Sequence, residues 1–124
     1  MIDFENANYV KLRKTKDDEF ASKLDPILIQ GEDYVASFRG VRDGVVFTNK
    51  RIITINVQGV TGKKKDFTSI PYSKIQLYSI ETGGTFDMDS ELIVWLSGSL
   101  QIRFEFFANS NIAQICQIIS SYVM

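Results

Sequence analysis

The sequence predicts a mainly β domain of the α+β class, in which an antiparallel sheet is closed by one C-terminal helix. From residue 34 onward, short segments place apolar residues at every second position, as half-buried strands do. Two of these segments flank Asn49-Lys50, which predicts a tight hairpin. The last segment changes to helical spacing. With 124 residues, 44% of them apolar and 12% aromatic, the chain is long enough for one domain with a substantial core.

The hairpin is the best-defined local element of the sequence. Val45, Val46 and Phe47 precede its turn, and Ile52 and Ile53 follow it. Branched and aromatic side chains of this kind suit a pleated strand. We expect Asn49 to adopt the left-handed backbone conformation of a tight turn.

Residues 1–33 differ from the rest and predict a short helical arm. Thr15 has the spacing of a helix-capping residue, and Pro26 ends the helix because the residue before a proline avoids helical dihedrals. We expect one face of this helix to carry Phe20, Ala21 and Leu24. The arm is expected to pack on the domain formed by residues 34–124 or on a neighbouring subunit.

Seven strands are expected in residues 34–107. Their short length and even spacing predict an antiparallel sandwich or barrel. The strand segments are residues 34–39, 43–48, 51–58, 63–70, 75–81, 91–97 and 100–107.

One of these strands, at residues 92–96, is apolar on both faces. Its outer face therefore needs a cover, which the N-terminal arm, the C-terminal helix or a neighbouring chain could supply. A second apolar segment follows Pro26 and is too short to bury itself. Together they give the candidate interface residues Ile27, Leu28, Ile29, Ile93 and Trp95.

The final segment predicts an amphipathic helix of about a dozen residues. Its apolar positions have the spacing i, i+3, i+4, i+7, and they are Ile112, Ile115, Cys116, Ile119 and Val123. Asn111 and Gln114 are placed to cap its first turn. We expect Cys116 to be a small core residue.

Four blocks of the chain resemble the bacterial pleckstrin-homology-like (PH-like) domain family. They are residues 42–53 (RDGVVFTNKRII), 59–65 (GVTGKKK), 70–75 (IPYSKI) and 81–87 (ETGGTFD). The resemblance implies a partly open, seven-stranded antiparallel barrel that is capped by the C-terminal helix. It also implies a domain without catalytic activity that forms ring-like homo-oligomers and whose ligands are poorly defined.

Eukaryotic relatives of that family bind phosphoinositides through a basic loop between the first two strands. The corresponding loop here is only Gly40-Val41-Arg42. With Arg39 it provides too few basic side chains, so we do not expect a lipid-headgroup site there.

Charge and composition exclude several other classes of function. The net charge is −1, from 14 basic and 15 acidic residues, so no strong positive field favours nucleic acid. The chain contains no histidine, which removes the commonest acid–base catalyst and metal ligand. We therefore expect no catalytic residue, no cofactor and no metal. The N-terminus lacks an apolar leader and no segment could span a bilayer, so we expect a cytoplasmic protein.

Two features remain as candidate binding elements. Lys63, Lys64 and Lys65 form the one concentrated basic run, which could attract an anionic membrane or an acidic partner. The same lysines could instead protect an exposed strand edge. Gly83 and Gly84 precede Phe86 in a turn, and paired glycines there predict a mobile binding loop.

We favour a non-enzymatic scaffold that self-associates into a homo-oligomer. The alternative is a monomeric adaptor that binds anionic lipid or an acidic peptide through the lysine run. The apolar strand at residues 92–96 favours the first hypothesis, and the lysine run favours the second.

Overall fold

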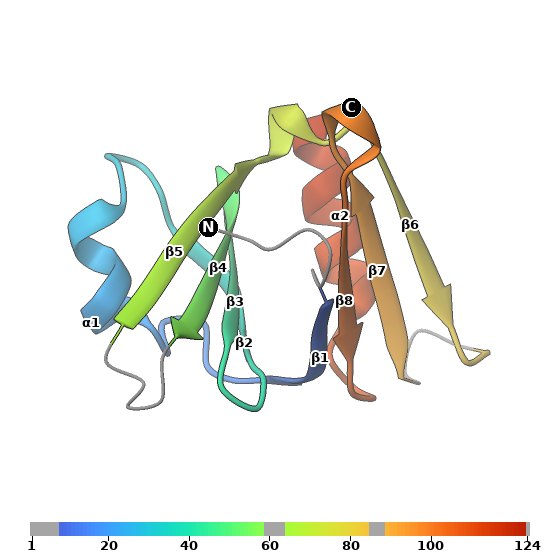
Figure 1. Ribbon diagram of the computed structural model, residues 1–124, viewed down its shortest axis with the longest axis horizontal. Helices are drawn as coiled ribbons and strands as arrows, with labels where there is room; N and C mark the ends of the chain where they lie inside the picture. Colours follow the sequence, from blue (N-terminus) through green and yellow to red (C-terminus); the bar gives the residue numbers. More distant parts are fainter. Residues whose placement is uncertain (1–7, 59–63, 85–88, 124) are drawn as a thin grey trace.

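The computed structural model describes residues 8–58, 64–84 and 89–123. Eight strands form one curled sheet in the order β5-β4-β3-β2-β1-β8-β7-β6, a half-barrel with the long helix α2 against it (Figure 1). The strands are β1 (Asn8–Lys14), β2 (Tyr34–Arg39), β3 (Gly44–Thr48), β4 (Arg51–Gln58), β5 (Lys64–Pro71), β6 (Leu77–Thr82), β7 (Ser90–Trp95) and β8 (Gln101–Phe106). The helices are α1 (Ala21–Leu24) and α2 (Ile112–Val123), with 3-10 turns η1 (Asp25–Ile27), η2 (Tyr72–Lys74) and η3 (Ser97–Ser99).

The PH-like fold and all seven expected strands are confirmed. The structure adds an eighth strand, β1, inside the segment that we expected to be a helical arm. That expectation was wrong for residues 8–14, which lie in the middle of the sheet between β2 and β8. The short helix expected before Pro26 is present as α1.

Strand β1 joins the two halves of the sheet, because it pairs with β2 on one side and with β8 on the other. It pairs antiparallel with β2, where Arg13 lies opposite Arg39, and parallel with β8, where Tyr9 lies opposite Phe104. The register with β8 shifts between Tyr9 and Leu12, and Lys11 in this bulge has a φ of 56°. The extra residue keeps both Tyr9 and Leu12 buried, which breaks the two-residue period by which a strand is recognised.

The main core lies on the concave side of the sheet and is rich in aromatic rings. Tyr9 stacks on Phe104 with ring centroids 5.5 Å apart, and Phe38 meets Phe106 edge-on at 4.8 Å. The ring centroids of Phe47 and Phe104 are 6.4 Å apart. These rings come from four strands of both halves of the sheet, so they hold the half-barrel together.

Helix α2 closes this core, as the sequence predicts. Ile112, Ile115 and Ile119 are completely buried against it. Asn111 donates its side-chain amide to Gln114 Oε1 at 3.3 Å, a bond between the two side chains rather than the expected cap on a backbone amide. Cys116 is only half-buried, so placing it in the core was wrong, because Ile115 and Ile119 fill the inward stripe.

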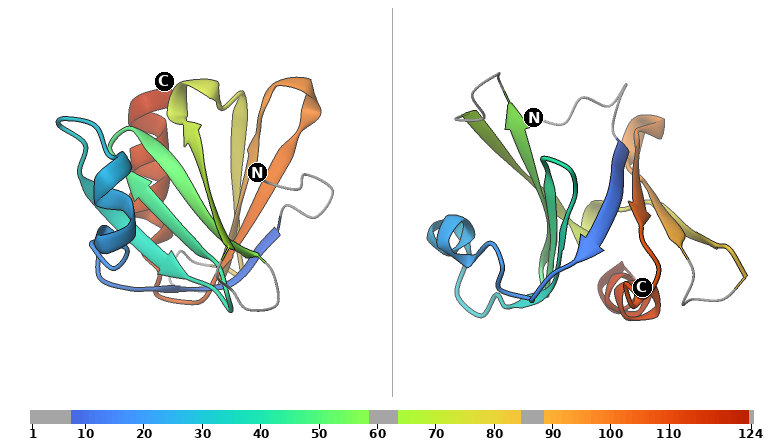
Figure 2. Two further views of the ribbon diagram at one scale, coloured as in Figure 1. Left: turned by 60° about the vertical axis from the view of Figure 1, so that its left-hand side comes forward. Right: turned by 90° about the horizontal axis from the view of Figure 1, so that it is seen from below.

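Helix α1 forms a second, smaller core on the outer face of β3 and β4. Phe20 and Leu24 pack there against buried side chains of both strands, namely Val46, Ile53 and Ile55. In the right-hand view of Figure 2, β2 and β3 lie between the two helices. Thr15 does not cap α1, because the helix begins at Ala21 and the Thr15 hydroxyl donates to the Ser37 carbonyl at 3.1 Å.

Gly44 lies directly under the ring of Phe20, the residue that precedes α1. A Cβ atom at this position would lie 2.7 Å from Cζ of Phe20. We expect Gly44→Ala to lower the free energy of unfolding by about 1–3 kcal/mol, because the ring must leave a packed site. Chemical denaturation measures this change. Gly40→Ala is the control, since a Cβ there makes only ordinary contacts of 3.4 Å or more, and equal stability of the two variants would contradict the prediction.

Candidate functional site

The β3–β4 hairpin is fixed to the segment before β2 by a buried ion pair. Both carboxylate oxygens of Glu32 accept from the Arg51 guanidinium at 2.9 Å. Oε2 of Glu32 also accepts the Thr48 hydroxyl at 2.7 Å, and Oε1 accepts the Ile29 amide at 3.1 Å. The Glu32 side chain is fully buried. Burial alone would raise its pKa, but the bonds from Arg51, Thr48 and Ile29 outweigh it, so the pKa lies below its ordinary value.

Asn49 at the hairpin tip does not have the conformation that we expected. It is not among the residues with positive φ. Its side chain instead spans the loop before β2, donating to the Gly31 carbonyl at 2.9 Å and accepting the Asp33 amide at 2.8 Å. The Thr-Asn-Lys-Arg turn therefore positions residues 27–33 rather than only reversing the chain.

The first half of the candidate interface lies on this fixed segment. Ile27 is 40% exposed and Ile29 is 60% exposed. Leu28 between them turns inward and packs on the second, smaller core beside α1. Arg51 Nη2 donates to the Ile27 carbonyl at 2.8 Å. Ile27, Leu28 and Ile29, hereafter the 27–29 patch, thus present two apolar side chains on a rigid support.

The second half lies on the outer face of β6 and β7. Leu77 faces Trp95 across the two strands, and Ile93 is the next outward residue of β7. Leu77 is 55% exposed, and Ile93 and Trp95 are half-buried. These three residues are hereafter the β6–β7 patch. The sequence predicted Ile93 and Trp95 as interface residues but not Leu77.

We expected the N-terminal arm, the C-terminal helix or a neighbouring chain to cover this face. Neither α1 of the arm nor the C-terminal helix α2 does so. Helix α2 packs on the opposite face with Leu92 and Val94, and α1 lies on β3 and β4. In Figure 1, α2 passes behind β7 and β8, leaving the near side of β6 and β7 open. Within residues 8–58, 64–84 and 89–123, no element covers the β6–β7 patch.

The lysine run begins an edge strand of the sheet. Lys63 lies outside the described residues, whereas Lys64 and Lys65 are exposed at the start of β5. Lys23 of α1 joins them: partial burial lowers its pKa, and the neighbouring charge of Lys65 lowers it further. The position fits both interpretations of the run, an anion-attracting patch and protection of a strand edge.

The glycine turn after β6 is only partly described. Gly83 donates its amide to the Asp89 carbonyl at 3.3 Å, and Gly84 has a φ of 137°, which favours glycine. Phe86, the expected binding residue, lies outside the described residues. The proposed binding role of this loop stays a prediction.

No group of acidic, cysteine or histidine side chains in the described part of the chain could hold a metal ion. The same residues include no helix long and apolar enough to cross a bilayer.

Sequence reasoning missed one concentration of charge because it missed β1. That strand brings Lys11, Arg13 and Lys14 beside Arg39 of β2. In the sequence, the three residues belong to a segment of net acidic character, and only the pairing of β1 with β2 joins them to Arg39. A recognised strand at residues 8–14 would have revealed the cluster.

Comparison with known proteins identifies relatives over nearly the whole chain. A model of the bacterial PH domain family matches residues 3–123. The chain is 53% identical over 77 residues to the uncharacterized protein YjqA of Bacillus subtilis (strain 168), a match that spans 62% of each chain. It therefore covers less than two thirds of that relative's length.

Two solved bacterial structures are similar to the chain over most of its length. A DUF1696 family protein with a pleckstrin-homology domain from Shewanella loihica is 39% identical, with a TM-score of 0.79 over 93% of this chain and 99% of the other. A pleckstrin homology domain from Shewanella amazonensis is 40% identical, with a TM-score of 0.65 over 89% and 90% of the two chains.

Proposed function

This chain belongs to the bacterial PH domain family, and from that premise we propose that it is a non-enzymatic scaffold that assembles with further copies of itself into a ring-like homo-oligomer. The observation that carries the proposal is the β6–β7 patch, an apolar sheet face that the described elements leave open. Leu77 is exposed and Ile93 and Trp95 are half-buried in this patch, and apolar surface of this kind on a folded domain is often part of a protein interface.

The positions of the two apolar patches favour a ring. The 27–29 patch adjoins α1 at one side of the half-barrel, and the β6–β7 patch lies at the other (Figure 1). Because the two patches differ and lie apart, a contact between them joins unlike surfaces of successive copies. Contacts of this head-to-tail kind close into rings or continue as filaments.

The supports of both patches are suited to an interface. Residues 27–29 are held by two bonds: Arg51 donates to the Ile27 carbonyl, and the Ile29 amide donates to Glu32. The β6–β7 patch lies on paired strands. Surfaces that are already rigid lose little conformational freedom on association, which strengthens binding.

Native mass spectrometry of the full chain tests the proposal. We expect a closed assembly at micromolar concentration, many times the subunit mass of 14.1 kDa. Trp95→Glu and Ile29→Glu should each reduce it to monomer, because a buried unpaired carboxylate opposes either side of the contact. Mixing the two variants should give a heterodimer with one intact contact, since each variant retains the patch that the other lacks.

Val41→Glu serves as the control, because Val41 is 79% exposed and lies outside both patches. The assembly that this variant forms should have the same number of subunits as the assembly of the original chain. A strict monomer at every concentration would contradict self-association and favour the monomeric adaptor that uses the lysine run at residues 63–65. An assembly that survives both glutamate variants would place the interface elsewhere.

A further inference from the structure

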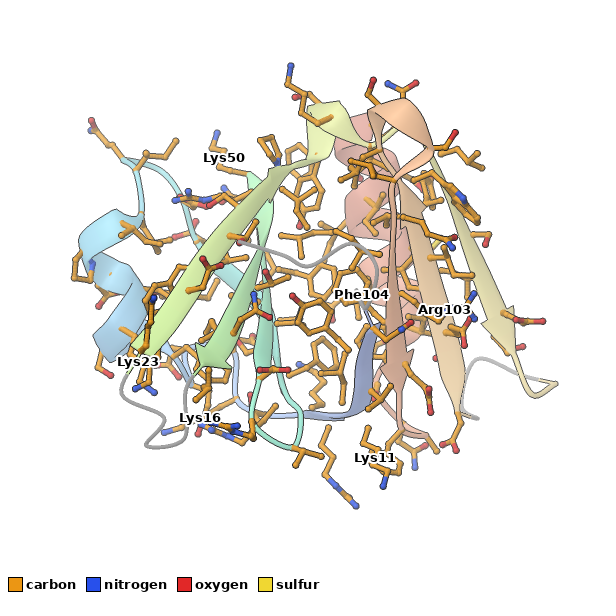
Figure 3. All side chains as sticks on the ribbon, in the orientation of Figure 1. Lys11, Lys16, Lys23, Lys50, Arg103 and Phe104 are labelled. Atoms are coloured by element: carbon orange, nitrogen blue, oxygen red, sulfur yellow. The ribbon has the colours of Figure 1, made fainter. Side chains whose placement is uncertain are left out.

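A basic cleft lies between β1, β2 and the residues that follow β8. It has a volume of about 470 Å³. Its lining contains four basic side chains and no carboxylate: Lys11, Arg13, Lys14, Thr15, Arg39, Gly40, Val41 and Phe107. A second hollow of about 270 Å³ shares Arg13, Lys14 and Phe107 and continues toward Ser110. Together they are hereafter the β1 cleft, at the lower edge of Figure 3, where Lys11 is labelled.

The β1 cleft gathers four basic side chains, which are incompletely neutralised. Arg13 and Arg39 are direct cross-strand partners, and like charges in that position destabilise a sheet. Carboxylates at the rim pair with Lys14 at 3.2 Å and Arg39 at 3.4 Å; they are Asp17 and Glu19. Among the described residues, no carboxylate forms an ion pair with Lys11 or Arg13. A chain of net charge −1 thus concentrates uncompensated positive charge in one concave place.

The backbone of β1 also departs from ordinary strand geometry at this point. Lys11 has a φ of 56°, a left-handed conformation that is uncommon for a residue with a side chain. The bulge leaves both Lys11 and Arg13 exposed while Tyr9 and Leu12 stay buried. An unusual backbone conformation and like-charged residues at paired strand positions both lower stability, and such features persist where a site uses them.

We propose that the β1 cleft binds an extended acidic segment of a partner protein, in which apolar side chains alternate with carboxylates. Apolar groups are interspersed with the cations of the cleft: Val41 is 79% exposed, and the Phe107 ring lies 4.2 Å from the Arg13 guanidinium. Carboxylates of the partner pair with Lys11 and Arg13, and its apolar side chains contact Val41 and Phe107.

A bare phosphate group fits the cleft less well than such a segment. Phosphate sites commonly use free backbone amides. Here the Phe107 amide donates to the Leu12 carbonyl at 2.9 Å, and the Ala108 amide donates to Asp89 at 2.6 Å. The cleft is also open and continues into the second hollow, which suits a chain segment rather than a small enclosed ligand.

Fluorescence anisotropy with the full-length chain tests this proposal. The probe is a labelled peptide that alternates Glu and Leu, and its control replaces every Glu with Gln. We expect only the acidic peptide to bind, with an affinity that falls as salt is added. The double variant Lys11→Gln, Arg13→Gln should bind it about tenfold more weakly, as expected for the loss of two exposed charge pairs.

Lys50→Gln is the matched control, because Lys50 is exposed at the opposite end of the molecule from Lys11 (Figure 3). It should leave the affinity unchanged, as should Lys64→Gln with Lys65→Gln. Thermal unfolding of each variant shows that it is folded, and native mass of the same samples shows whether self-association is altered separately.

Several results would overturn the proposal. Equal binding of the Gln peptide, or an unchanged affinity in the double variant, would exclude the β1 cleft as the acidic-segment site. Loss of binding in the Lys64, Lys65 variant alone would assign the peptide to the edge of β5. Inorganic phosphate, anionic vesicles and single-stranded DNA are tested in the same way. If one of them binds more strongly than the peptide and loses its binding in the double variant, the cleft belongs to that ligand class.

Discussion

Deletion of residues 111–124 is expected to abolish cooperative folding. The deletion removes α2, whose Ile112, Ile115 and Ile119 are fully buried in the main core. At about 1.5–3 kcal/mol for each buried aliphatic side chain, these three contribute roughly 5–9 kcal/mol gross. That amount is comparable to the whole net stability of a domain of this size. Circular dichroism during urea titration should show no sigmoidal transition.

A graded version of this experiment keeps the helix and removes only its packing. Ile115→Ala should lower the free energy of unfolding by about 2–5 kcal/mol, because it leaves a cavity in a core that cannot collapse fully. Gln117→Ala is the control, since Gln117 is exposed on the same helix and should change stability by less than about 0.5 kcal/mol. A cooperatively melting truncation product would show that α2 does not complete the core.

The second large effect concerns the buried ion pair of the hairpin. Glu32→Ala is expected to lower the free energy of unfolding by about 3–5 kcal/mol, because it leaves the Arg51 guanidinium largely buried without its counter-charge. The Thr48 hydroxyl and the Ile29 amide lose their acceptor at the same time. Glu32→Gln should lose less, since its amide oxygen still accepts one of these bonds. Urea denaturation at neutral pH measures both changes.

The pH dependence of stability provides an independent test of Glu32. The pKa of this carboxyl in the folded state lies below its ordinary value of 4.5. Its contribution is therefore fully present above about pH 4.5 and is lost as the pH falls through the lower pKa of the folded state. Between about pH 5 and pH 3, the original chain should lose stability more steeply than Glu32→Gln, because only the original chain carries this group.

Glu19→Gln is the matched control for both measurements. Glu19 also pairs with an arginine, at 3.4 Å from Arg39, but this pair is more exposed than that of Glu32, with side-chain exposures of 27% for Glu19 and 52% for Arg39. Such pairs contribute less than about 1 kcal/mol. If Glu32→Ala and Glu19→Gln had similar effects, the ion pair between Glu32 and Arg51 would not secure the hairpin.

Local patterns predicted most of the fold because most elements of this chain bury one regular face. Strand β8 alternates buried Ile102, Phe104 and Phe106 with polar residues, and α2 places its buried isoleucines at helical spacing. Strand β1 escaped prediction because the bulge at Lys11 shifts its alternation by one residue. Its other partner, β8, is also remote in the sequence, so no turn marks the pairing.

The candidate site was predictable to the extent that it depends on one element. Ile93 and Trp95 followed from a strand that is apolar on both faces, and Ile27 and Ile29 from an apolar segment after a proline. Leu77 and the β1 cleft depend instead on which strands lie side by side, and the role of Asn49 depends on a loop sixteen to eighteen positions earlier in the chain. Such contacts are properties of the topology, which residue spacing does not reveal.

The parallel pairing of β1 with β8 has a consequence for synthesis on the ribosome. Strand β1 emerges well before Gln101–Phe106 of β8, so the edge of β1 that faces β8 stays unpaired until β8 has been made. Ordering between positions so distant costs loop-closure entropy and slows folding. Until then, the nascent chain therefore exposes an unpaired strand edge, where a holdase chaperone or a neighbouring nascent chain could bind.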